Sequence, residues 1–144
     1  MAADRRISAL EVLQRLKQQT IDGISVQLKE IRLEQTGIHR EMEELQDRAE
    51  QESRVTSPEA LPFLADFLRA LDQRKEILKA RLKELDHKAE ELEDQLVDAF
   101  AEVKKGEVVL DLARQKIQLK ERRRETDESA EIAQNIFLRG QSKL

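Results

Sequence analysis

The sequence predicts an all-α protein in which two long helices form an antiparallel coiled-coil hairpin, the second helix being longer and ending in a C-terminal overhang. Three observations support this. The 144 residues are 39% charged, and only four are aromatic, a composition typical of long helices rather than of a compact core. Apolar residues repeat in heptads through most of the chain. A single proline-bearing break interrupts the heptads near the middle.

The first helix is expected over about residues 5–54. Asp4 is one candidate N-cap, and Ser8 with Glu11 forms a capping box that offers a second start. A heptad stripe, the seam that faces the other helix, is strict from Ile21 onward, where it comprises Ile21, Ile24, Leu28, Ile31, Gln35, Ile38, Met42, Leu45 and Ala49. Ahead of it, a shifted stripe is expected from Leu10, Leu13 and Leu16.

The turn is expected at about residues 54–60. Ser57 is a good N-cap and Pro58 a good first residue for the second helix. Pro62 complicates this start because its ring removes one early helical N–H. Either the first turn of the second helix is distorted, or the regular helix begins near Leu61.

The second helix is expected over about residues 60–139, with Gly140 as its stop. One heptad register runs through Leu64, Leu68, Leu71, Leu78, Leu82, Leu85, Ala89, Leu92, Leu96, Ala99, Val103, Leu110, Ala113 and Ile117. Lys75 and Gly106 interrupt it. Gly106 is either a neutral surface position or a seam position that allows close approach or bending. Past Ile117 the register fails.

The two stripes are expected to pack within one chain, so that residues 1–144 form a single hairpin and the isolated chain is a monomer. A parallel dimer of hairpins or a self-associated bundle would show the same stripe. Residue 5 would lie opposite about residue 109, which leaves an overhang of roughly 30 residues. The seam residues expected to hold the hairpin together are Ile24, Leu28, Ile31, Ile38, Leu45, Leu78, Leu82, Leu85, Leu92 and Leu96.

Charge is sorted along the chain. Residues 41–52 hold six acids and one base, whereas residues 104–124 hold eight bases and three acids. These charges are either the solvated faces of a coiled coil or a basic end that docks on an acidic partner. Nucleic acid is disfavoured because no aromatic residues interleave with the bases. The basic residues assigned to partner binding are Arg114, Lys116, Lys120, Arg122, Arg123 and Arg124.

Catalytic, cofactor and metal sites are not expected. The chain has no cysteine, its four glycines are scattered, and its two histidines lack neighbours at metal-ligand spacing. Its carboxylate pairs fall on exposed helix faces, where no pocket would raise a pKa. An enzyme is therefore not predicted, and neither a signal peptide nor a membrane span is expected.

Two segments resemble the FliJ proteins of the bacterial flagellar type III export apparatus. Residues 63–71, FLADFLRAL, are similar to the segment that opens the family's second helix. Residues 120–130, KERRRETDESA, are similar to its C-terminal signature, a charged E-x-x-R run leading into Asp-Glu-x-Ala. The length and two-helix layout also match over nearly the whole chain.

The resemblance implies a cytoplasmic protein at the inner face of the inner membrane, similar to the stalk of a rotary ATPase. Its implied partners are the hexameric export ATPase, the membrane export gate and the escort chaperones of late substrates. Phe67 and Leu71 match the residues associated with gate contact, but Arg48 and Glu52 stand where the family often has tyrosines. Injectisome stalk proteins share this architecture, and a generic coiled-coil scaffold that dimerises through its overhang is the alternative of another class.

Overall fold

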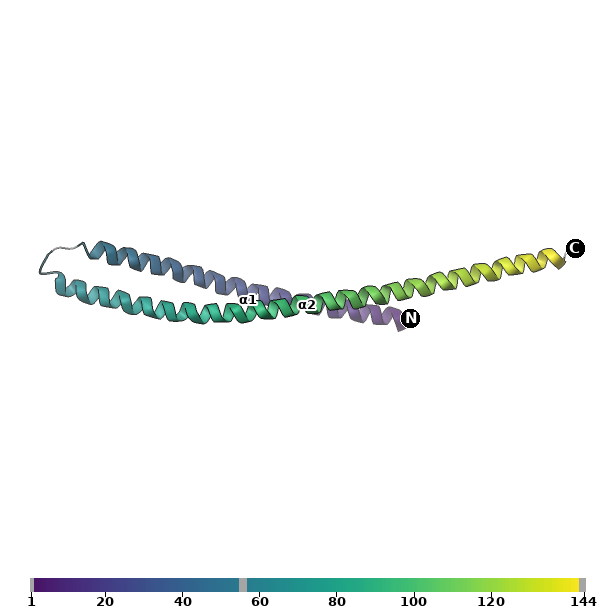
Figure 1. The fold of residues 1–144 in the computed structure, drawn as a ribbon, viewed down its shortest axis with the longest axis horizontal. Helices are drawn as coiled ribbons and strands as arrows, with labels where there is room; N and C mark the ends of the chain where they lie inside the picture. Colours follow the sequence, from purple (N-terminus) through teal and green to yellow (C-terminus); the bar gives the residue numbers. More distant parts are fainter. Residues whose placement is uncertain (1, 55–56, 143–144) are drawn as a thin grey trace. The chain divides into compact units, whose positions relative to one another are not determined.

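The computed structural model describes residues 2–54 and 57–142, which form two helices, α1 (Ala2–Glu52) and α2 (Leu61–Ser142). These ranges contain no strand, and α2 is the longer helix (Figure 1). The predicted all-α helical hairpin is therefore confirmed. The chain divides into unit 1 (residues 1–19 and 100–144) and unit 2 (residues 20–99), and each unit contains a stretch of both helices.

The turn of unit 2 ends α1 earlier than predicted and starts α2 at one of the two expected places. The Ser53 amide donates to the Ala49 carbonyl at 3.1 Å, and α1 ends at Glu52. The Leu64 amide donates to the Ala60 carbonyl at 2.9 Å, so Ala60 caps a helix that begins at Leu61. Pro62 is thus tolerated in the first turn, where its missing N–H has no helical acceptor.

The predicted start at Ser57 and Pro58 is wrong, because both residues precede α2. Pro58 instead belongs to a turn in which the Ala60 amide donates to the Ser57 carbonyl at 3.2 Å. Val55 and Thr56, which also fall in the predicted turn, lie outside the described residues.

The core of unit 2 lies between α1 and α2. Ile38, Leu45, Leu78 and Leu85 form one buried cluster, and Leu85 is only 1% exposed. Four neighbouring seam residues are partly buried and pack against this cluster: Ile31, Met42, Leu71 and Leu82. Leu28 is also buried, whereas Ile24, Leu92 and Leu96 are half-buried. The side chains of the predicted stripe thus face the partner helix throughout this unit.

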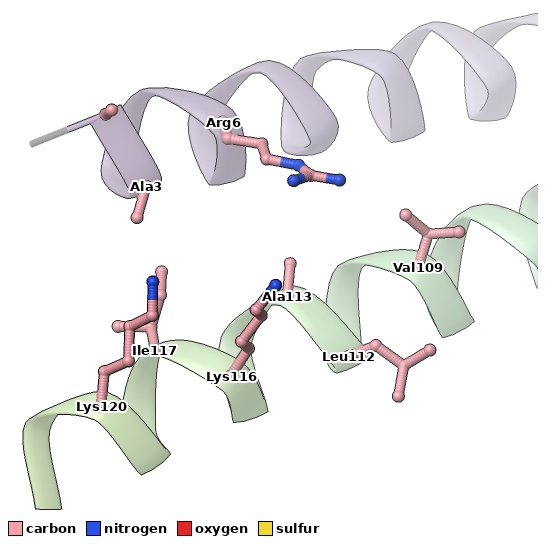
Figure 2. Close-up of a pocket in the computed structure, with 9 residues that line it drawn as sticks. Ala3, Arg6, Val109, Leu112, Ala113, Lys116, Ile117 and Lys120 are labelled. Atoms are coloured by element: carbon pink, nitrogen blue, oxygen red, sulfur yellow. The ribbon is translucent and has the colours of Figure 1, made fainter. Parts of the chain in front are cut away.

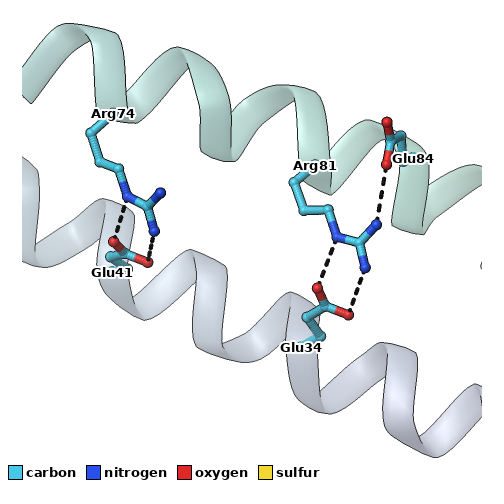
Figure 3. Close-up of polar contacts among 5 residues, drawn as sticks. All are labelled: Glu34, Glu41, Arg74, Arg81 and Glu84. Carbon is cyan, nitrogen blue, oxygen red and sulfur yellow. Dashed lines mark hydrogen bonds and ion pairs between the residues drawn. The ribbon is translucent and has the colours of Figure 1, made fainter.

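Two arginines of α2 reach across the edge of this core to carboxylates of α1 (Figure 3). Arg81 donates to the two oxygens of Glu34 at 2.8 and 3.2 Å, and also to Glu84 at 3.1 Å. Arg74 donates to Glu41 at 2.9 and 3.3 Å. The hydrogen bond from Arg81 lowers the pKa of Glu34 below its usual 4.5. Such exposed pairs mainly fix the helix register, since each contributes little to stability.

In unit 1 the seam of α1 keeps its phase but becomes polar. Leu10, Gln14 and Lys17 occupy successive half-buried positions, whereas Leu13 and Leu16 are about half exposed. The predicted shift of the stripe is therefore wrong. It was inferred from apolar residues alone, and Gln14 and Lys17 carry no apolar signal although their long side chains pack along the seam.

The position of α1 against α2 in unit 1 also differs from the predicted register. Arg114 donates to Glu11 at 3.1 Å, and Ile117 is still half-buried. Part of the difference arises because helical side chains lean toward their own N-terminus, so a side chain contacts a residue of the other helix that lies farther along the sequence. Because α1 also begins at Ala2, ahead of both predicted caps, the pairing extends farther along α2. The unpaired part of α2 thus begins near residue 118, not 110. At its other end α2 continues through Gly140 to Ser142, so the predicted stop at Gly140 is wrong.

Candidate partner-binding surfaces

The C-terminal extension, residues 118–142, is the largest candidate surface. It is helical throughout, and each of its residues is exposed. Three segments follow one another along it. Residues 120–124 hold four bases and one acid, residues 125–131 hold four acids and no base, and residues 132–138 include four large apolar side chains. Those four side chains, Ile132, Ile136, Phe137 and Leu138, are all more than half exposed.

The predicted basic residues divide into three groups. Arg114 lies in the paired part of unit 1, where it binds Glu11, so its assignment to an unpaired overhang is wrong. Lys116 and Lys120 line a groove beside the first turns of α1. In the extension the guanidinium of Arg124 lies 3.2 Å from Glu128 one turn away, while Arg122 and Arg123 are exposed.

The groove lies in unit 1, between the first turns of α1 and residues 109–120 of α2 (Figure 2). Its apolar lining combines small residues of α1, Ala2 and Ala3, with Val109, Leu112 and Ile117 of α2. Three cations, Arg6, Lys116 and Lys120, also line it. Because alanines cannot fill the space beside the larger residues of α2, the end of the seam stays open. Sequence reasoning missed this groove, although the small residues at the start of α1 were a visible signal.

The second candidate surface is the beginning of α2. Phe63 is 78% exposed and Phe67 is 37% exposed, and both line a hollow with Glu52, Ala60 and Leu64. Leu71 is half-buried and packs against the core cluster of unit 2. The two residues assigned to gate contact thus differ, since Phe67 is partly accessible whereas Leu71 supports the fold. Phe63 offers the larger accessible ring, although the sequence assigned gate contact to Phe67 and Leu71 and not to Phe63.

Residues 2–54 and 57–142 contain no cluster of three or more metal-ligating side chains, and the His87 Nε2 atom lies 3.3 Å from the exposed carboxylate of Glu91. Neither described helix has a stretch apolar enough to cross a membrane.

A helical hairpin with an exposed charged extension defines a class of coiled-coil proteins whose surfaces suit binding to other proteins. Residues 6–142 match the model of the family described as flagellar FliJ protein, so the chain belongs to the FliJ family. This membership makes it a component of the flagellar export apparatus. No curated protein and no solved structure matches the chain.

Proposed function

We propose that this protein is a non-enzymatic stalk that docks its C-terminal extension into the central hole of the hexameric export ATPase. The observation that carries the proposal is the exposure of every residue from 118 to 142 in a helix that begins within a paired coiled coil. A helix that extends past its partner helix receives few stabilising contacts from its own chain, so another protein is the natural source of such contacts.

The basic segment at residues 120–124 gives this docking its electrostatic component. Long-range attraction to an acidic lining raises the association rate and makes it depend on salt. The Debye length falls from about 10 Å at 0.1 M salt to about 3 Å at 1 M, so high salt should slow association. The exposed Ile132, Ile136 and Phe137 would add apolar contact once docked.

Links to the rest of the apparatus belong to the same proposal. We assign contact with the export gate to the start of α2, around Phe67, and Leu71 acts there by holding that surface in place. The escort chaperones of late substrates are further partners. The working location is then the cytoplasm, at the inner face of the inner membrane. The family resemblance supports these assignments.

Charge reversal in the extension tests ATPase docking. Arg122, Arg123 and Arg124 are changed together to Glu, and binding to the export ATPase hexamer is measured at several salt concentrations. We expect weaker binding with less salt dependence, and unchanged helicity and melting, because these residues are exposed and lie past the paired part of α2. The matched control reverses three bases of unit 2, Arg69, Lys79 and Lys83. Wild-type affinity and salt dependence in the first variant would favour a generic scaffold.

A further inference from the structure

The lining of the groove in unit 1 is complementary to a partner that has both apolar and acidic side chains. Val109, Leu112 and Ile117 give it an apolar floor, and Leu112 is 60% exposed. Arg6 and Lys120 add positive charge at its sides (Figure 2), and none of the described residues that line it is acidic. Binding an apolar helix there would remove exposed surface from water, and acidic flanks would pair with the cations.

The C-terminal extension itself has this chemistry. Asp127 and Glu131 are four residues apart and therefore lie on one face of the helix. Ala130, Ala133 and Phe137 follow at steps of three and four and form an adjoining apolar stripe. Phe137 is 64% exposed. The groove lies earlier on the same helix, so an extension that remains helical can reach it only from another copy of the chain.

The spacing of the charges fits a twofold-symmetric arrangement. Lys116 and Lys120 are also four residues apart, so an antiparallel pairing of two α2 helices can set Lys116 opposite Glu131 and Lys120 opposite Asp127. The same register brings Phe137 to within one turn of Leu112 of the other copy. A twofold axis repeats every one of these contacts.

We propose that this groove binds the C-terminal extension of a second copy, so that two chains form a twofold-symmetric antiparallel dimer. The heptad stripe packs within one chain, and the proposed dimer uses a different surface. This dimer is a separate interaction from the proposed docking into the ATPase, because one extension cannot occupy the groove and the ATPase at the same time.

The first experiment measures the mass of the full chain by sedimentation velocity over a range of concentrations, without any partner. We expect a reversible monomer–dimer equilibrium. Lys116→Glu with Lys120→Glu should weaken the dimer by at least roughly tenfold, because four attractive pairs become repulsive. The matched control, Lys79→Glu with Lys83→Glu, makes the same charge change on α2 in unit 2 and should leave the dimer unchanged.

Charge exchange then tests the register. Asp127→Lys with Glu131→Lys should also prevent self-association, but a mixture of this variant with the doubly reversed lysine variant should form a heterodimer, because all four pairs become attractive again. A monomer for the wild-type chain at every concentration overturns the proposal. A wild-type dimer whose two variants fail to combine overturns it as well, because the dimer then uses another surface.

Cysteine crosslinking supplies an independent readout, since the chain has no native cysteine. Leu112→Cys and Phe137→Cys in one chain lie about 37 Å apart along a straight helix, so a disulfide between them must join two copies. Mild oxidation should give a covalent dimer from the double variant in the wild-type background, and much less in the reversed lysine background. Equal crosslinking in both backgrounds would contradict the assigned register.

Discussion

The side chain of Gln14 lies against Gly106, and a methyl group on that glycine would overlap the Gln14 amide. The Gln14 Nε2 atom donates to the Val103 carbonyl at 3.0 Å, but its Oε1 atom is buried and lacks a hydrogen-bond partner among the described residues. Gly106 therefore allows close approach, one of the two roles expected of it. Such a polar contact makes the seam of unit 1 weaker than an apolar one, because a buried unsatisfied oxygen costs about 1–3 kcal/mol.

Replacing Gln14 by Leu should stabilise the hairpin. The substitution removes the unsatisfied oxygen and adds an apolar side chain at a seam position, and it loses one hydrogen bond worth about 1 kcal/mol. A net gain of about 1 kcal/mol is expected, read as a higher melting temperature by circular dichroism. Leu13→Gln, next to it on the exposed side, should change little. A lower melting temperature for Gln14→Leu would contradict the role given to the unsatisfied oxygen.

Truncating Leu85 should be among the most destabilising single changes in the seam. Leu85→Ala removes the most buried side chain of the unit 2 cluster and should cost roughly 2–4 kcal/mol. Leu82, Leu92 and Leu96 should follow the same trend to a smaller extent, since they are half-buried. Denaturant unfolding of Lys88→Ala and Glu84→Ala provides the comparison. Equal losses in both sets would mean that the helices pack in another register.

The pair between Arg81 and Glu34 should give a small acid-dependent contribution to stability. The fold lowers the pKa of Glu34, so the contribution is complete above its usual 4.5 and is lost as the pH falls through the lowered value. Glu34→Gln removes it, so the melting temperatures of this variant and the wild type should converge below pH 4.5. Glu43→Gln serves as the control. If the difference in melting temperature between the two proteins stays constant down to about pH 3, the contribution of the pair does not depend on the ionisation of Glu34.

The contact with the export gate is predicted to depend on Phe67. Phe67→Ala should keep the helicity and weaken gate binding, because an accessible aromatic ring near the turn can anchor a partner. Leu71→Ala should also lower the melting temperature, since Leu71 supports the core cluster. Phe63→Ala is the matched comparison, as its ring is the more exposed of the two. Intact gate binding by a folded Phe67→Ala variant would refute the assignment.

The sequence was sufficient for the helical hairpin because the seam positions of unit 2 are apolar at heptad spacing, apart from Gln35 and Lys75. It was insufficient for unit 1, where Gln14, Lys17 and Gly106 occupy seam positions without being apolar. The groove could not be predicted, because it depends on how far α1 extends along α2. That extent is set by the residue at which α1 begins and by the direction in which helical side chains point. The sorting of charge along the chain was visible in the sequence. The placement of Arg114 beside Glu11 was not, because it depends on the register of α1 against α2.

The continuity of α2 has a consequence for the extension. Forming a first helical turn in isolation is unfavourable, whereas adding residues to an existing helix needs only propagation. Residues 118–142 continue a helix whose earlier part is already held by packing, so they grow from a ready nucleus and fray only from the C-terminal end. Warming should shorten this extension gradually, and amide hydrogen exchange should slow steadily from Ser142 back toward Gln118.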